Sequence, residues 1–345
     1  MSPLIKKKHE EVKEAVDSPV DSDLAFVTRK INVEQVLSTG STLLDLAISG
    51  KRRRGGGLPG GIVVEIYGPS GSGKTAILAE ICASAQNLGG ETNFLDPEAR
   101  LDREYARIYD MKLDTKNYSR PDTVEEVFKT VSAWEPKSTK AINVIATDSL
   151  AALSTELEMG PKGDKMGMKR AKEFSTGFRK TARQLAKANW LMACTNQVRQ
   201  GDYGETTPGG LAIAFYASLR IRVRQTDDVV REVTLDGGKK VKKVLGIEST
   251  CFIKKSSVDD PYREVPIFII FGYGIDDIRG NLQYTKDMTN ATVYTCPDGK
   301  TYQALNAAIG HVEKEELQDQ LKENTIVLWE TIESRFNSNR PTKRR

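Results

Sequence analysis

The sequence predicts an α/β fold with a central, mostly parallel sheet flanked by helices. Residues 62–67 form an apolar run rich in β-branched side chains, which is typical of a buried strand. The glycine-rich segment GPSGSGKT follows at once, and a helix-periodic pattern opens after it at Ala76. Further short apolar segments at 92–95, 141–147 and 190–195 supply the other strands of an open α/β sheet.

The eight residues after this strand match GxxxxGK[ST], the pattern of a phosphate-binding loop. They are Gly68, Pro69, Ser70, Gly71, Ser72, Gly73, Lys74 and Thr75. Glycines let backbone N–H groups turn inward around a phosphate, and the following helix adds the positive end of its dipole. Lys74 supplies a positive charge for the β- and γ-phosphates, and the Thr75 hydroxyl supplies a hard oxygen for Mg²⁺. Since the strand and helix context fits as well, we expect the chain to bind a nucleoside triphosphate.

Composition narrows the class of protein. The 345-residue chain has a formal net charge of +4, which permits a polyanionic partner without requiring one. Its four cysteines form no CxxC pair and it has two histidines, so no zinc spacing can be built. Neither a signal peptide nor an apolar run near the ~18 residues of a membrane-spanning helix is recognisable. We therefore expect a reduced, cytoplasmic protein with no membrane partner.

The predicted domain organisation has a large core and small appendages. Residues 1–32 form a polar, helix-prone arm that either frays or docks on a neighbouring subunit, and residues 33–272 form the core. Residues 273–338 are expected to be a small α+β lobe with one amphipathic helix around 315–336, followed by a basic tail at 339–345. Within the core, the basic insert that begins at Lys51 is either a solvated loop or a secondary polyanion contact.

Two carboxylates that follow predicted strands are candidates for catalysis and for metal binding. Glu98 comes just after the strand at 92–95, where a side chain faces the ligand crevice of an open α/β sheet. It is either a base that orients an attacking water or an acid at the start of the next helix. Asp148 ends the apolar strand that begins near Ala141, which is the usual position of the Mg²⁺ partner of the loop hydroxyl. Ser149 is a candidate for contacting the metal through water.

Two glycine-rich loops, at 156–167 and 198–210, flank one helix and one buried strand. The helix at 169–188 carries several basic residues, and the second loop contains Arg199 and Tyr203. Basic groups beside glycines suit a phosphodiester backbone, while the alternative is two lids over the nucleotide. Downstream, alternating strands at 219–223, 248–254 and 264–271 complete the sheet, with a hairpin turn at Leu235–Lys239.

Taken together, these segments resemble the RecA family of homologous recombinases, of bacterial or phage type, from about Val33 to about Asp276. The resemblance rests on VEQVLSTGS, LLDLAISG, VVEIYGPSGSGKT, FLDPEARLDREYAR, VIATDSLAAL, MGMKRAKEFSTGFRKTARQLAKAN, NQVR, ETTPGG, AIAFYASLRI and FGYGIDDIRG, in that order. It implies a RecA-type P-loop ATPase core, ATP and Mg²⁺ as cofactors, and assembly into a helical filament with ATP between subunits.

The resemblance also implies roles for individual residues. Lys74 and Thr75 bind phosphate and Mg²⁺, Asp148 supports the metal, Glu98 is the catalytic glutamate and Gln197 senses the γ-phosphate. Asp102 and Tyr105 resemble adenine contacts. Lys254 and Lys255 lie where lysines reach the ATP of a neighbouring subunit, and Phe215 resembles an interface aromatic. The positions expected near the DNA backbone are Arg170 or Lys172, Ser175, Arg179, Arg199, Gly209 and Gly210.

The implied function is that of a DNA-stimulated ATPase that coats single-stranded DNA and promotes pairing and strand exchange with a homologous duplex. Two alternatives stay open: a ring-forming helicase motor, and an ATP-switched filament protein without strand exchange. The chain departs from the family at the basic insert, at its shorter second loop and at Ser256 and Ser257, where a second lysine is expected. Its basic tail replaces an acidic one, which suggests a phage or otherwise divergent member.

Overall fold

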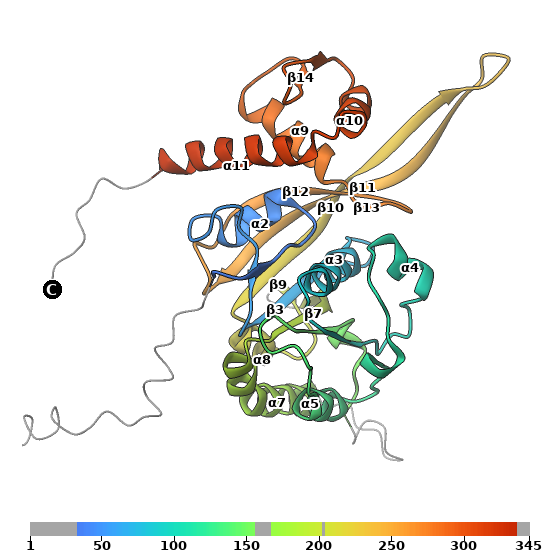
Figure 1. Ribbon diagram of the computed structural model, residues 1–345. Coiled ribbons are helices and arrows are strands. Elements are labelled where there is room, and N and C mark those ends of the chain that lie inside the picture. The colour runs from blue at the N-terminus through green and yellow to red at the C-terminus, as the bar shows by residue number, and fades with distance from the viewer. Residues whose placement is uncertain (1–32, 156–166, 202–203, 337–345) are drawn as a thin grey trace, which may run out of the picture. The chain divides into compact units, whose positions relative to one another are not determined.

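The computed structural model describes residues 33–155, 167–201 and 204–336 (Figure 1). The predictions for the N-terminal arm, for most of the first glycine-rich loop, for Tyr203 and for the basic tail lie outside these residues. The proposed domain boundaries therefore stay predictions.

The described strands and helices follow one another along the chain with these bounds. The strands are β1 (Val36–Leu37), β2 (Leu58–Pro59), β3 (Val63–Gly68), β4 (Thr92–Leu95), β5 (Tyr118–Ser119), β6 (Val144–Thr147), β7 (Leu191–Gln197), β8 (Arg199–Gly201), β9 (Gly204–Thr206), β10 (Leu219–Thr234), β11 (Lys240–Ser256), β12 (Glu264–Ile270), β13 (Gly274–Ile275), β14 (Tyr294–Thr295) and β15 (Thr301–Tyr302). The helices are α2 (Thr42–Ser49), α3 (Lys74–Asn87), α4 (Arg103–Ile108), α5 (Val124–Ala133), α7 (Gly167–Ala188), α8 (Leu211–Tyr216), α9 (Asp277–Met288), α10 (Leu305–Lys314) and α11 (Gln318–Ser334).

A nine-stranded sheet organises the described chain, in the order β13-β12-β11-β10-β3-β7-β6-β4-β5. From β10 to β5 every neighbouring pair is parallel, whereas β11, β12 and β13 add antiparallel strands at the other end. The predicted fold class is therefore confirmed. The central strands β3, β4 and β6 are buried throughout, including polar residues such as Glu65 and Asn93.

Helices cover both faces of this sheet, with α3 on one side and α5 and α7 on the other (Figure 1). The core beneath α5 and α7 includes Phe128, Phe174 and Phe178, whose rings meet edge-to-face or stacked. Gly177 makes this approach possible, because a Cβ atom there would lie 2.0 Å from the Phe128 ring. A larger residue at this position would push α5 away from α7.

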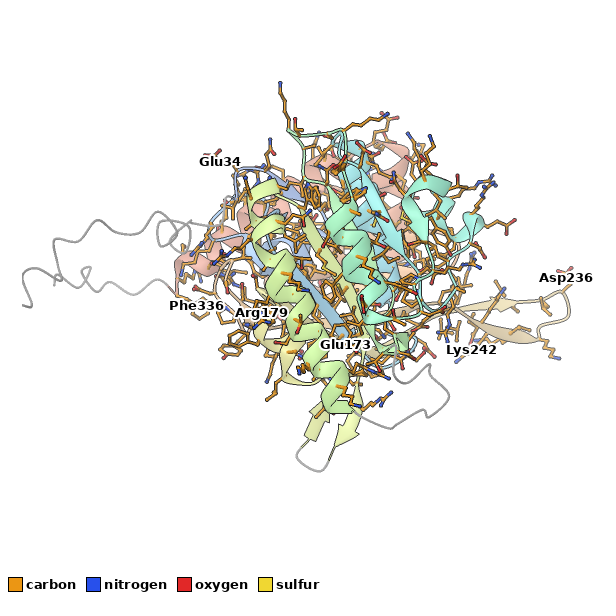
Figure 2. All side chains as sticks on the ribbon, turned by 90° about the horizontal axis from the view of Figure 1, so that it is seen from below. Glu34, Glu173, Arg179, Asp236, Lys242 and Phe336 are labelled. Atoms are coloured by element: carbon orange, nitrogen blue, oxygen red, sulfur yellow. The ribbon has the colours of Figure 1, made fainter. Side chains whose placement is uncertain are left out.

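Strands β10 and β11 extend well beyond the predicted strand at 219–223. Only the first part of β10 pairs with β3, and only residues 246–252 of β11 pair with β12. Between them, the described residues 227–244 form a two-stranded ribbon that projects from the sheet, with Asp236 and Lys242 marking its outer part (Figure 2). The sequence there is mostly polar, so hydrophobic alternation did not identify it, although the predicted turn at Leu235–Lys239 is present.

The C-terminal residues contain three helices, not the one predicted around 315–336. Helices α9, α10 and α11 surround a small core that includes Leu282, Val312 and Leu321. The buried apolar residues of α9 and α10, among them Leu282 and Val312, face this small local core.

The basic insert after α2 is largely exposed, as expected for a solvated loop, and two of its basic side chains form exposed ion pairs. The Lys51 ammonium lies 2.7 Å from the Asp260 carboxylate, and Arg54 donates to both carboxylate oxygens of Glu323 on α11. Arg53 donates to the carbonyl oxygen of Val33. These partners come from the two ends of the described chain and from the loop before β12, so periodicity could not predict them.

One buried carboxyl group, that of Asp45, and two half-buried ones, those of Glu80 and Asp277, gather where α2, α3 and α9 meet. Asp45 accepts from the Thr39 amide and hydroxyl, and Asp277 accepts from the Thr42 amide and hydroxyl. Burial raises the pKa of Asp45 to about 6 and also raises the pKa of Asp277. Burial is the main cause that raises the pKa of Glu80 on α3 to about 7, and the nearby charges of Asp45 and Asp277 raise it further.

We expect Glu80→Gln to flatten the pH dependence of stability. The folded chain keeps the Glu80 proton up to about pH 7, whereas the unfolded chain loses it near pH 4.5. Raising the pH through this window therefore favours unfolding, by about 2 kcal/mol for such a group. Urea unfolding at pH 5 and pH 7.5 measures the difference. The exposed Glu104→Gln change is the control and should keep the wild-type slope; an unchanged slope in Glu80→Gln would contradict the assignment.

Candidate nucleotide-binding and DNA-binding site

The candidate site lies along the carboxyl ends of four neighbouring parallel strands. In the register of the sheet, Gly68 at the end of β3 lies beside Gln197 at the end of β7. Thr147 at the end of β6 pairs with Cys194 of β7 and with Leu95 at the end of β4. The residues that follow each strand therefore emerge at one edge, which is where ligands bind in open α/β sheets.

The phosphate-binding loop joins β3 directly to α3. Gly73 caps the helix at a φ of 91°, and a Cβ atom there would lie 2.1 Å from the Ile269 side chain. Both observations require glycine at this position. The Lys74 ammonium donates to the Pro69 carbonyl oxygen at 2.6 Å, across the loop. Burial lowers the pKa of Lys74, while the nearby Asp148 and Glu98 carboxylates act in the opposite direction.

Thr75 and Asp148 come together as predicted, although 73 residues separate them in the sequence. The Thr75 hydroxyl donates to Asp148 Oδ2 at 2.6 Å, and the Thr195 hydroxyl donates to Asp148 Oδ1. Burial raises the pKa of Asp148. A hydroxyl and a carboxylate at the mouth of a phosphate-binding loop are hard oxygen donors of the kind that Mg²⁺ prefers, so this pair fits the metal.

Glu98 lies at the centre of the site and does not begin a helix. Its Oε1 atom accepts from the Ser149 hydroxyl at 2.5 Å and from the Gln197 side-chain amide at 3.3 Å. Asp102, four residues later, is the N-cap of α4. The structure thus removes the alternative in which Glu98 caps the helix, and it turns Ser149 toward Glu98.

These side chains line one cavity of about 410 Å³. Its polar wall includes Lys74, Thr75, Glu98, Asp148 and Gln197, whereas Tyr105, Ile269 and Phe271 belong to its apolar wall. Of the two predicted adenine contacts, Tyr105 lines the cavity. The Asp102 carboxylate instead accepts from the Tyr105 amide at 2.6 Å, is exposed, and is not among the lining residues.

Sequence reasoning missed Arg100, Phe271 and Ser149 as direct contributors to this arrangement. Arg100 forms an ion pair with Glu98 at 2.7 Å, and Phe271 reaches the cavity from the end of β12. Ser149 was noticed only as a metal contact. Two signals were available: Arg100 follows Glu98 by two residues, and Phe271 is an aromatic residue just after a strand.

A buried polar chain ties β7 to the second glycine-rich loop. The Asn196 amide donates to Glu65 at 2.9 Å and to the carbonyl oxygen of Pro208 at 3.1 Å. Glu65 is fully buried and pairs with Arg220 at 2.5 Å. The end of the loop, just before Gly209, is therefore fastened to the same strand that carries Gln197.

The second loop is a short hairpin in which β8 pairs with β9, so the prediction of a simple loop is corrected. Arg199 is exposed and lies two residues beyond Gln197. At the other end of the loop, Gly209 and Gly210 have φ values of 91° and 62°. A Cβ atom on Gly210 would contact Ala171 of α7 at 3.6 Å, so the loop ends against the start of that helix.

Helix α7 carries the other predicted DNA contacts. Lys172, Ser175 and Arg179 follow an i, i+3, i+7 spacing and so share one face, with Lys172 and Arg179 exposed. Figure 2 shows Arg179 on this helix. Arg170 is half-buried and lies on a different face. The helix geometry thus places Arg170 and Lys172, the two alternatives that the sequence left open, on different faces of α7.

Lys254 and Lys255 do not line the nucleotide cavity of their own chain. The Lys255 ammonium donates to the carbonyl oxygens of Ala214 and Phe215 at 2.9 Å each, and burial lowers its pKa. Lys254 is exposed, with its ammonium 5.9 Å from the centre of the Phe252 ring. Phe215 on α8 is 75% exposed, so an apolar residue is available beside Lys255.

Two further features, a cluster of metal-binding side chains and a membrane-spanning helix, are absent from the described parts of the chain. No group of three or more histidine, cysteine, aspartate or glutamate side chains there could hold a metal ion. None of the helices in those parts is both long and apolar enough to cross a bilayer. All four cysteines, Cys82, Cys194, Cys251 and Cys296, are free and buried.

Comparison with known proteins identifies relatives of this chain. Residues 22–276 match the family model described as the RecA N-terminal domain. The chain is 36% identical over 266 residues to Protein RecA of Ruminococcus albus, covering 75% of this chain and 63% of that protein. It is 35% identical over 252 residues to Protein RecA of Symbiobacterium thermophilum, covering 71% and 67%. For Protein RecA of Thermus thermophilus the identity is 36% over 249 residues, covering 70% and 69%.

The matched region contains the whole candidate site, from the phosphate-binding loop to Phe271 and the hairpin at Arg199. The aligned part of the chain spans less than two thirds of the length of the Ruminococcus albus relative. The family model covers most of this chain, and the three relatives are 35–36% identical over 70–75% of it. The chain belongs to the RecA family.

Proposed function

We propose that the chain is an ATP-dependent recombinase that forms a helical filament on single-stranded DNA. In this proposal it pairs that strand with a homologous duplex and exchanges strands, while DNA-stimulated ATP hydrolysis controls assembly and release. The observation that carries the proposal is the position of Gln197. Its side chain donates to Glu98 in the nucleotide cavity, and its backbone continues through Val198 into the hairpin that begins at Arg199.

ATP is proposed to bind with its phosphates in the loop from Gly68 to Thr75. Backbone N–H groups and the start of α3 receive the phosphates, and the Lys74 ammonium leaves the Pro69 carbonyl to contact the β- and γ-phosphates. Tyr105 and Phe271 provide aromatic surface for the base. Mg²⁺, held by Thr75 and Asp148, would neutralise charge on the phosphate oxygens.

Glu98 is proposed to act as the general base. Its carboxylate accepts a proton from the attacking water, and its hydrogen bonds from Ser149 and Gln197 fix the orientation of the carboxylate. Lys74 stabilises the charge that develops on the transferred phosphoryl group. Loss of the γ-phosphate then changes the surroundings of Gln197, and this change is transmitted to the hairpin at Arg199.

Lys254, Lys255 and Phe215 are proposed to serve a second copy of the chain. All three lie away from the cavity of their own chain, and the exposed Phe215 ring suits a subunit contact. A nucleotide held between two copies adds contacts only when the γ-phosphate is present. ATP therefore favours the assembled state by its higher affinity for that state.

DNA is proposed to contact the exposed face of α7 and the second loop. Lys172, Arg179 and Arg199 can each neutralise a phosphate, and the half-buried Ser175 and the exposed Gly210 allow the DNA backbone to approach closely. Gly209 is buried against Ile213 and Phe174, so it is a weaker candidate. The half-buried Arg170 is the weaker candidate of its pair. Because these contacts address phosphates, binding should tolerate any sequence and weaken with salt.

Glu98→Gln should lower the rate of ATP hydrolysis by about 10²–10⁴-fold while leaving ATP binding intact, because the amide cannot take a proton from water. The variant should therefore remain bound to both ATP and DNA. Single-turnover hydrolysis and filter binding of labelled single-stranded DNA measure the two effects. Unchanged turnover would show that Glu98 is not the base.

Arg199→Ala should weaken binding to single-stranded DNA and lower DNA-stimulated hydrolysis, with nucleotide affinity unchanged. Removing one phosphate contact should also reduce the slope of log affinity against log salt by about 0.7 for a single strand. The exposed Arg107→Ala change removes a charge from α4 and serves as the matched control. Loss of ATP binding in Arg199→Ala would instead make the second loop a lid over the nucleotide.

Negative-stain imaging with a long single strand, with and without ATP and Mg²⁺, tests the function as a whole. We expect extended helical filaments that require ATP, accompanied by DNA-stimulated hydrolysis. Closed rings with directional unwinding would favour the helicase alternative. Filaments without hydrolysis or strand exchange would favour an ATP-switched binding protein.

A further inference from the structure

We propose that Arg100 distinguishes ATP from ADP at this site, by exchanging its partner Glu98 for the γ-phosphate when a triphosphate binds. The inference rests on the proposed function and adds a residue to it. In the structure Arg100 pairs with the carboxylate assigned as the base. In the ATP-bound chain it becomes a ligand of the γ-phosphate and leaves Glu98 available to water.

The first observation is the ion pair itself. Arg100 Nη1 lies 2.7 Å from Glu98 Oε2, and both side chains line the nucleotide cavity. The Arg100 side chain is 73% exposed, whereas that of Glu98 is only 13% exposed. The guanidinium therefore reaches in from the mouth of the cavity, and its long side chain has room to move.

The second observation is that the turn around Arg100 is held rigidly. The Asp96 carboxylate is buried and accepts from the amides of Arg100 at 3.2 Å and Leu101 at 2.9 Å. It also accepts from the Tyr118 hydroxyl at 2.7 Å. Between Glu98 and Arg100, Ala99 has a φ of 53°, in the left-handed region that a residue with a Cβ atom seldom adopts.

This left-handed residue brings the side chains of Glu98 and Arg100 to the same cavity. Strained backbone of this kind persists when the surrounding structure imposes it, and it gathers at functional sites. Here Asp96 supplies the constraint. Asp96 is thus a positioning residue for Arg100, and the guanidinium starts from a fixed point beside the base.

The third observation concerns the oxygen atoms of Glu98. Oε1 already accepts from Ser149 and Gln197, so Oε2 is the oxygen with fewer partners, and Arg100 occupies it. A water bound for attack would compete with the guanidinium for that oxygen. Moving Arg100 to another partner would remove this competition.

The γ-phosphate is the partner that the chemistry favours. It carries more negative charge than a carboxylate, and the planar guanidinium fork matches phosphate oxygens in two parallel hydrogen bonds. Lys74, Glu98 and Gln197 bound the region that the γ-phosphate would occupy, within the same cavity as Arg100. ADP lacks this group, so Arg100 would stay on Glu98 when ADP is bound.

The test measures how tightly Arg100→Ala binds a slowly hydrolysed ATP analogue, ATPγS, and ADP, each with Mg²⁺, by isothermal titration calorimetry. We expect about a tenfold or greater loss of ATPγS affinity, typical of a lost charge-assisted contact, with ADP affinity within about twofold of wild type. Arg107→Ala, which removes an exposed arginine seven residues away, should change neither affinity. Arg100→Lys keeps the charge without the fork and should fall between wild type and Arg100→Ala.

Equal losses for ATPγS and ADP would overturn the proposal and give Arg100 a general structural role. Unchanged ATPγS affinity would also overturn it. If Arg100→Ala lost its cooperative thermal transition, Arg100→Gln would supply the same ratio with a side chain of similar length. Failure of the proposed function looks different: wild type itself would then show no ATP hydrolysis with single-stranded DNA. Wild-type hydrolysis with an unchanged ratio in Arg100→Ala would reject only the role of Arg100.

Discussion

The parallel pairing of β3 with β7, continued through β6 to β4, is the constraint on which the candidate site depends. In this register Gly68 and Gln197 lie side by side at the ends of their strands, and Thr147 pairs with Leu95. A shift of one residue between two strands would turn their side chains to the opposite faces. The distances between Thr75, Asp148 and Glu98 therefore follow from backbone hydrogen bonds deep in the sheet.

Hydrogen bonds among buried polar groups then connect this edge to the surface. Thr195 and Asn196 lie on the same strand as Gln197, yet the three side chains donate hydrogen bonds to different partners. The Thr195 hydroxyl holds Asp148, the Asn196 amide holds Glu65 and Pro208, and the Gln197 amide holds Glu98. Leaving any of these buried polar groups without a hydrogen bond would destabilise the fold. The three hydrogen-bonded residues therefore act as one unit. In the proposed function, a change at the nucleotide would reach the hairpin at Arg199 through this strand.

The basic insert and the ribbon of β10 and β11 have different physical characters. The basic insert is held against carboxylates of α11 and of the loop before β12. Exposed ion pairs of this kind contribute little individually, about 0–1 kcal/mol each, but together they fix where the insert lies. The ribbon of β10 and β11 has exposed valines at positions 230, 233, 241 and 244. Among the described residues, its outer part pairs only with itself.

The sequence by itself determined the fold class, the phosphate-binding loop and the identity of most chemical groups. These are local properties: apolar runs mark buried strands, and the spacing of Gly68, Gly73, Lys74 and Thr75 is written in one continuous segment. Glu98 was left with two roles, because the distinction between a base and a helix cap depends on what lies across the crevice. Likewise, the choice between Arg170 and Lys172 needed the exact phase of α7.

Only the tertiary structure decided which groups meet. Ser149, Arg100 and Phe271 reach the cavity from the ends of different strands, and no spacing in the sequence encodes their convergence. The pairing of Arg54 with Glu323 and the clustering of Asp45, Glu80 and Asp277 likewise join residues from distant parts of the chain. Local patterns predict whether a residue is buried and in which kind of element it lies. The partner of a polar group depends instead on strand order and register, which arise only when the whole sheet has formed.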